Sequence, residues 1–145
     1  MKVLLQRVIS AKVVVDDKTI GEIEKGILVF LAIEKGDTEE RIKRMAQRVL
    51  NYRLFSDVDH KMNLNVTQTK GGVLAVSQFT LAANTGKGNR PSFTAAADPA
   101  LGESLYQLFV SQLSGQHSPV ATGSFGADMQ VHLVNDGPVT FWLEI

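Results

Sequence analysis

The hexapeptide Asn-Asp-Gly-Pro-Val-Thr at residues 135–140 constrains the C-terminal part of the chain more than any other feature. It joins two stretches of alternating apolar and polar residues, 128–134 and 139–145, which are typical of half-buried β-strands. Asn or Asp close to Gly favours a tight turn, so we predict a C-terminal hairpin. Pro138 after Gly137 is unusual there, because proline has a fixed φ, lacks an N–H and permits a cis bond before it. Such a rigid corner suits the presentation of backbone carbonyl groups at a fixed place and angle.

Length and composition indicate one soluble domain spanning residues 1–145. Of the 145 residues, 44% are hydrophobic and 21% are charged, which is enough apolar material for a real core. There is no cysteine, which excludes disulfides and thiolate metal sites. Arg7 comes too early for a secretory leader, and no apolar run is long enough to span a bilayer. We therefore expect a cytoplasmic protein with no membrane partner.

The charge balance bears on nucleic-acid partners. The formal net charge is zero, from 15 basic and 15 acidic residues. Sequence-blind binding of nucleic acid depends on a broad positive potential, so we expect no DNA partner of that kind. Recognition of a single RNA end needs only a local patch. Lys87 and Arg90 form such a patch in the glycine-bearing, acid-free segment 85–90.

Two amphipathic helices are predicted among groups of strands. Residues 38–51 repeat apolar side chains at helical spacing, with Asp37 as the expected N-cap. A second helix follows Asp98 as N-cap, with a proline at its first position, and ends near residues 114–115. The continuous apolar run at residues 27–33 suits a strand buried on both faces. Because helices and strands do not alternate strictly, we predict an α+β fold with a mostly antiparallel or mixed sheet.

Ser77, Gln78, Phe79 and Thr80 lie where an apolar strand gives way to a glycine-bearing loop. Their hydroxyl, carboxamide and backbone N–H groups could hold a carbonyl and stabilise an oxyanion. A protein nucleophile also needs an adjacent base, and residues 71–89 contain no His, Asp or Glu. From these residues alone, hydroxyls that satisfy the loop backbone are the better interpretation.

The two segments together resemble the signature motifs of the D-aminoacyl-tRNA deacylases. Residues 77–81 read Ser-Gln-Phe-Thr-Leu, and residues 135–140 fit the pattern Asn-x-Gly-Pro-x-Thr. Further family-like segments follow in the expected order along nearly the whole chain: 5–8, 53–57, 61–65, 90–93 and 125–129. The resemblance implies a barrel-like core of β-sheet carrying the two amphipathic helices.

The resemblance also implies a reaction and an assembly. The enzyme would hydrolyse the ester that links a D-amino acid to the 3′-terminal adenosine of tRNA, without a cofactor or metal. Family members are homodimers in which a Gly-Pro corner with a cis bond enters the pocket of the other subunit. Carried onto this chain, Gly137 and Pro138 would face four residues of the other subunit: Ser77, Gln78, Phe79 and Thr80. Fixed carbonyls would then exclude an L side chain, while glycine would pass.

The resemblance also suggests roles in catalysis, support or tRNA contact for single residues. Thr80 is the family's candidate nucleophile, but the missing base favours attack by water assisted by the ribose 2′-hydroxyl of the substrate. Arg7 is a candidate to brace the Gly-Pro corner, with a surface salt bridge as the alternative. Lys87 and Arg90 are candidates to touch tRNA phosphates, or else are solvated loop charges. Met129 belongs to a family-like segment and is a further candidate for support or tRNA contact.

Two other functions fit the sequence. The same fold could serve as an editing module that removes a wrong L-amino acid from tRNA. Alternatively, the chain could be a non-catalytic dimer that binds RNA ends, since no acid–base residue accompanies residues 77–80.

Overall fold

A computed structural model describes all residues from Met1 to Ile145. Its elements follow in this order: β1 (Lys2–Val15), β2 (Lys18–Ile23), β3 (Gly26–Ala32), α1 (Glu39–Asn51), β4 (Phe55–Ser56), β5 (Met62–Leu64), β6 (Gly72–Ser77), the 3₁₀ turn η1 (Phe79–Ala82), α2 (Pro99–Ser114), β7 (Val120–Thr122) and β8 (Gln130–Glu144). None of the helices combines the length and apolarity needed to cross a bilayer.

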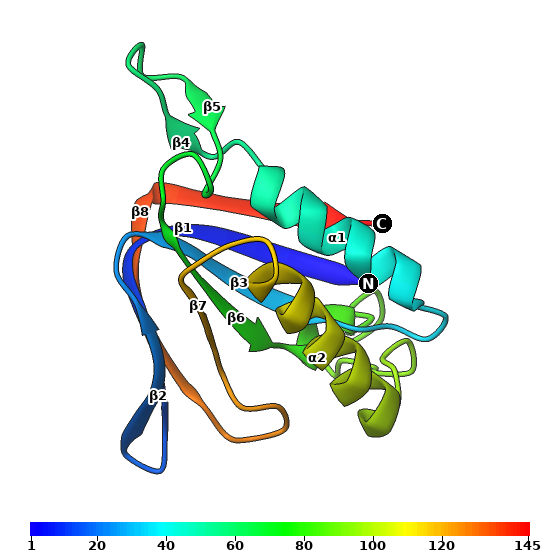
Figure 1. The fold of residues 1–145 in the computed structure, drawn as a ribbon. Coiled ribbons are helices and arrows are strands. Elements are labelled where there is room, and N and C mark those ends of the chain that lie inside the picture. Colours follow the sequence, from blue (N-terminus) through cyan, green and yellow to red (C-terminus); the bar gives the residue numbers. More distant parts are fainter.

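Six strands form one mixed sheet (Figure 1). The order is β2-β1-β3-β6-β7, and β8 pairs with β1. The β3–β6 and β6–β7 pairs are parallel, and the pairs made by β1 are antiparallel. The sheet curls until β2 approaches β7, where a Cβ added to Gly21 would lie 2.3 Å from the Thr122 carbonyl oxygen. The predicted α+β class, mixed sheet and barrel-like core are confirmed.

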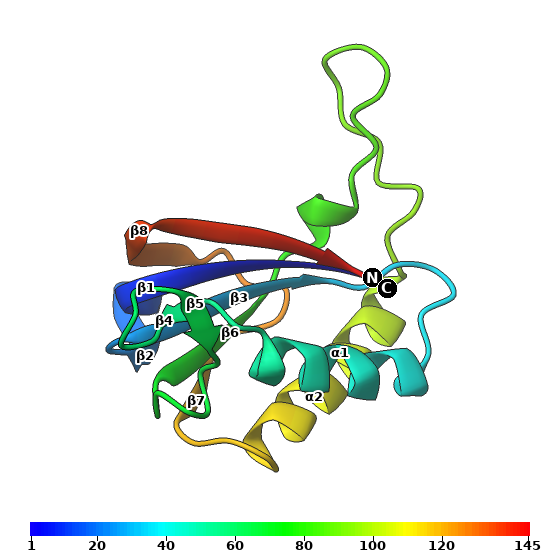
Figure 2. The same cartoon turned by 90° about the horizontal axis from the view of Figure 1, so that it is seen from above.

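Both helices cover the same face of the sheet (Figure 2). The main core lies between the two helices and the sheet, and it is filled by side chains of the helices and of β1, β3 and β6. Fully buried members include Leu5, Ile42, Met45 and Phe109. β3 is buried on both faces as predicted, with Leu28 packed in a second apolar cluster on the opposite side from Ile27.

The start of α1 differs from the prediction. Thr38, not Asp37, is the N-cap, and its Oγ1 accepts a hydrogen bond from the Arg41 amide at 3.4 Å. Asp37 is buried, where its Oδ1 accepts from the amino group of Met1 at 3.0 Å. Its Oδ2 accepts from the Glu34 amide at 2.7 Å. The Asp37 carboxylate therefore binds the amino group of Met1, far away in the sequence, and does not cap α1 as predicted. For α2 the predicted cap is correct, since Asp98 accepts from the Leu101 amide at 3.1 Å.

The predicted C-terminal hairpin is wrong. β8 is one long strand, and both of its halves pair with β1. Thr140 lies opposite Gln6 and Asn135 lies opposite Val8, so residues 136–139 bulge out opposite Arg7. Alternation looks the same in a hairpin and in one strand with a bulge, and a proline that cannot donate is accommodated at a bulge. The Gly137–Pro138 bond is cis.

Candidate active site

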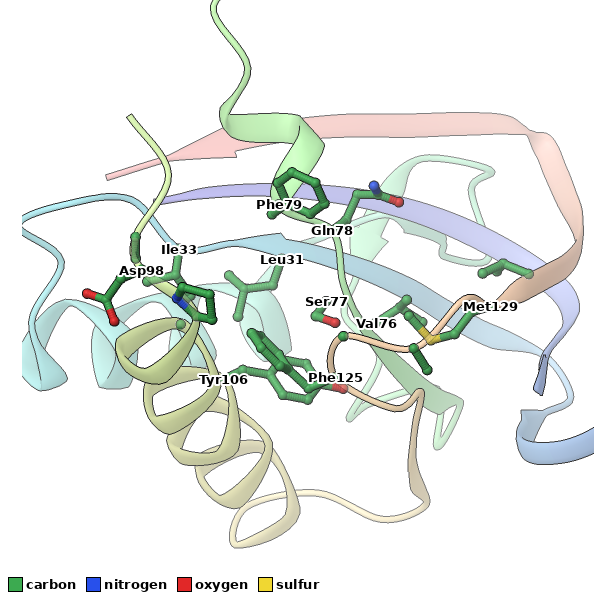
Figure 3. Close-up of a pocket in the computed structure, with 16 residues that line it drawn as sticks. Leu31, Ile33, Val76, Ser77, Gln78, Phe79, Asp98, Tyr106, Phe125 and Met129 are labelled. Atoms are coloured by element: carbon green, nitrogen blue, oxygen red, sulfur yellow. The ribbon is translucent and has the colours of Figure 1, made fainter. Parts of the chain in front are cut away.

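A pocket of about 450 Å³ opens where β6 ends and the chain turns into η1 (Figure 3). The start of α2 and the loop 123–129 form its other sides. The residues that line it are mostly apolar: Leu31, Ile33, Val76, Ser77, Gln78, Phe79, Ala97, Asp98, Pro99, Gly102, Tyr106, Phe125, Gly126, Ala127, Met129 and Val131.

Ser77, Gln78 and Phe79 form one rim of this pocket. Thr80 follows in η1 and is not among the lining residues. The backbone N–H of Gln78 donates to the Leu31 carbonyl at 2.8 Å. This bond extends the β3–β6 pairing by one step before the turn begins. Phe79 is 58% exposed, and its ring packs against that of Phe93 at 5.0 Å between centroids. Phe79 and Thr80 are the first two residues of η1. Their backbone N–H groups therefore have no acceptor within the turn and are free to bind a ligand.

Ionisable groups are scarce at the pocket. Asp98 and Tyr106 are the only two among the lining residues, so no basic side chain faces the cavity. Burial raises the pKa of Tyr106 to about 12, and its hydroxyl donates to the Ala75 carbonyl at 2.9 Å. Asp98 caps α2. Thr80 Oγ1 accepts a hydrogen bond from Gln78 Nε2, and no general base contacts it. The site can therefore bind and polarise a carbonyl but offers no activated protein nucleophile.

Two aromatic rings and a thioether form the apolar floor and wall. The rings of Tyr106 and Phe125 lie 5.8 Å apart at an interplanar angle of 41°. Met129 stands at the other side, and its Sδ accepts a hydrogen bond from the Ser124 amide at 3.4 Å. Figure 3 shows Phe125 beside Tyr106, with Met129 on the far side of Ser77.

The Gly-Pro corner lies apart from the pocket. Neither Gly137 nor Pro138 lines that pocket, and both residues are exposed. The first and last polar residues of the motif shape the bulge. Asn135 Oδ1 accepts from the Val139 amide at 3.0 Å, and Asn135 Nδ2 donates to Thr140 Oγ1 at 2.9 Å.

Arg7 lies opposite the bulge and ties it to the rest of the fold. Its Nε donates to the Asp136 carbonyl at 3.1 Å, and the same nitrogen is 3.2 Å from the Asp136 carboxylate. Its Nη1 donates to the Leu54 carbonyl at 2.8 Å. The guanidinium thus joins the corner to the segment between α1 and β4.

Comparison with known proteins places this arrangement in a family. The sequence profile of the D-Tyr-tRNA(Tyr) deacylases matches residues 4–144. The chain belongs to this family. A protein from Saccharophagus degradans named D-aminoacyl-tRNA deacylase is 62% identical over 143 residues, covering 99% of both chains. One of the same name from Haemophilus influenzae is 57% identical over 145 residues, covering both chains completely.

Two solved structures share the fold of this deacylase-family chain. One, described as a c-Myc DNA unwinding element binding protein, has a TM-score of 0.95 and 40% sequence identity, covering 100% of this chain and 99% of the other. The second, described as a probable eukaryotic D-amino acid tRNA deacylase, has a TM-score of 0.83. It is 17% identical and covers 99% of this chain and 98% of its own. The resemblance inferred from the motifs is thereby confirmed.

The remaining predicted residues of this deacylase-family chain are spread out. Lys87 and Arg90 are exposed on the loop between η1 and α2, which projects from the body in Figure 2. Neither residue lines the pocket. Sequence reasoning missed Tyr106 and Gly102 as pocket residues. Their spacing of four places them on one face of α2, but the same spacing is usual for a core helix.

Proposed function

We propose that the protein hydrolyses the ester bond of D-aminoacyl-tRNA and releases a D-amino acid and uncharged tRNA. The observation that carries this proposal is the placement of the two signature segments. Residues 77–79 rim a pocket that has polar groups but no acid–base pair, and residues 135–140 form a hydrogen-bonded corner with Gly137 and Pro138 exposed. A binding rim and a rigid presenter of carbonyls suit selection by shape better than attack by a side chain.

The proposed active form is a homodimer in which each corner enters the pocket of the other subunit. Support comes from the exposure of Gly137 and Pro138 and from their absence from their own pocket. β1 and β8 also expose large apolar side chains, with Ile9 56%, Val134 52% and Trp142 46% accessible. Such side chains are commonly covered at an interface between subunits.

The chirality of the substrate is judged by the backbone of the corner. With the ester and the α-amino group held, the two enantiomers differ in where the side chain and hydrogen point. Carbonyl oxygens fixed where an L side chain must lie exclude it by overlap. The side chain of a D-amino acid points elsewhere, so many D-amino acids are accepted. Glycine has no side chain to exclude, so glycyl-tRNA is a substrate too.

Catalysis relies on the substrate's own ribose. The 2′-hydroxyl assists the attack of water on the adjacent ester, and the N–H groups at the start of η1 stabilise the oxyanion. The mostly apolar pocket with its exposed Phe79 suits the terminal adenosine, because bases stack on aromatic rings. Lys87 and Arg90 lie on the projecting loop, where they are able to meet the preceding phosphates.

The proposed function is tested by incubating the protein with D-tyrosyl-tRNA, L-tyrosyl-tRNA and glycyl-tRNA and measuring the ester that remains. We expect rapid loss of the D ester, measurable loss of the glycyl ester and protection of the L ester. Preferential loss of the L ester would indicate an L-editing module instead. Binding of tRNA without any hydrolysis would indicate a non-catalytic dimer at RNA ends.

Thr80→Ala is expected to keep at least about a tenth of the wild-type kcat, because the hydroxyl binds or orients and does not attack. Single-turnover hydrolysis of D-tyrosyl-tRNA measures this directly. Thr80→Ser, which keeps a hydroxyl, is the matched control and should differ little from Thr80→Ala. A loss of about 1,000-fold or more in the alanine variant, with activity kept in the serine variant, would identify Thr80 as the nucleophile.

A further inference from the structure

Gly102 is an unexpected residue in the middle of α2. Glycine weakens the interior of a helix relative to alanine, because it loses more backbone freedom on folding. It is buried on the face that lines the pocket. A Cβ built there would meet one neighbour, the ring of Phe125, at 3.3 Å from Cζ and 3.8 Å from Cε2. The missing side chain therefore makes room for that ring and for nothing else.

Phe125 is held in a notch of α2. Gly102 lies one turn before Tyr106 on the same helix face, so the ring of Phe125 rests over the glycine and against the tyrosine. Tyr106 is a firm support, because it is buried and its hydroxyl donates to the Ala75 carbonyl of β6. Phe125 itself is half-buried at the pocket, so the open side of its ring faces the cavity (Figure 3).

We propose that Gly102 is a positioning residue that sets the depth of the pocket floor through Phe125. The inference rests on the proposed function and adds to it the element that determines how deeply the tRNA end is seated. In Gly102→Ala, the added methyl group would lie closer to the Phe125 ring than ordinary packing allows. The helix backbone and Tyr106 are fixed, so they cannot yield in place of the ring. The ring therefore moves by a few tenths of an ångström toward the cavity. The pocket becomes shallower while the fold remains intact.

Gly102→Ala should separate stability from substrate binding. We expect a Tm equal to or above that of the wild type, since alanine favours the helix. We also expect KM for D-tyrosyl-tRNA to rise about threefold to tenfold with kcat nearly unchanged, because the loss is one of uniform binding. Ser104→Ala is the matched control, because this exposed position on α2 gains helix propensity without touching Phe125. It should leave KM unaltered.

A double-mutant cycle tests the route through the ring. Leucine at position 125 has no atoms where Cζ and Cε2 lie, so Gly102→Ala should have little effect on KM in a Phe125→Leu background. Equal KM values for wild type and Gly102→Ala, or an undiminished effect in the leucine background, would overturn the inference and leave the proposed function standing. A wild-type protein that hydrolyses no D-tyrosyl-tRNA would overturn the proposed function, and the inference with it.

Discussion

Gly137→Ala is expected to lower kcat/KM for D-tyrosyl-tRNA by about 100-fold, the scale of a misplacement near 1 Å. Gly137 has a φ of +130°, which L residues rarely adopt. An added Cβ would lie 2.8 Å from Val139 Cγ2 and 3.1 Å from Arg7 Nη2. The corner must therefore shift, and its carbonyls leave the positions at which they frame the substrate in the proposed dimer. Single-turnover hydrolysis of D-tyrosyl-tRNA and of L-tyrosyl-tRNA measures both activity and selectivity.

The matched control for this substitution is Gly36→Ala. Gly36 also has a positive φ, of +84°, but a Cβ there would meet no atom within 4 Å. The control therefore carries the backbone penalty without displacing the corner, and its activity should stay near that of the wild type. Full activity and unchanged selectivity in Gly137→Ala would show that the corner does not judge chirality. An equal loss in both variants would mean that general destabilisation explains the effect.

Arg7→Ala is expected to lower kcat/KM by about tenfold or more and the free energy of unfolding by about 1–3 kcal/mol, because the bonds of a mostly buried charged group are lost. The Asp136 and Leu54 carbonyls lose their donor, and the bulge loses its tie to the segment before β4. Urea unfolding gives the stability change, and hydrolysis of D-tyrosyl-tRNA gives the change in activity. Arg7→Lys should recover only part of either, since one ammonium cannot reproduce the planar fork of donors.

Arg48→Ala is a useful comparison for Arg7→Ala. Arg48 also donates to a carbonyl of β8, that of Glu144 at 2.9 Å, but at the end of the strand remote from the corner. Its guanidinium bond is exposed, so its loss should alter stability little and activity not at all. Should the two alanine variants lose activity equally, the contact between Arg7 and the corner would have no special role.

The sequence could predict the elements well because each has a local cause. The periodicity of α1, the cap and proline of α2 and the apolar run of β3 depend on neighbours in the chain. The hairpin prediction failed because residues 128–134 and 139–145 alternate in the same way whichever strand they pair with. The choice of partner depends on β1, far away in the sequence. Asp37 was misassigned for a similar reason, since the amino group of Met1 is a long-range partner.

The candidate site was only partly predictable. Ser77, Gln78 and Phe79 stood out because polar residues interrupt the end of an apolar strand, and all three line the pocket. The floor was hidden, because Tyr106 follows the same helical spacing as the core residues of α2. The purpose of Gly102 appears only when Phe125, from a distant loop, is placed against it.

The pairing of β1 with β8 has a consequence for how the protein is made. One edge of β1, the first strand, pairs with β8, the last strand. The Arg7 side chain and the Asp136 carbonyl that it binds are 129 positions apart in the sequence. Contacts so distant form late, because a long loop must close before they contribute. During synthesis, the Gly-Pro corner is therefore not locked in place until β8 has emerged from the ribosome and paired with β1. Until then, a nascent chain carries the pocket rim of residues 77–79 without a fixed corner.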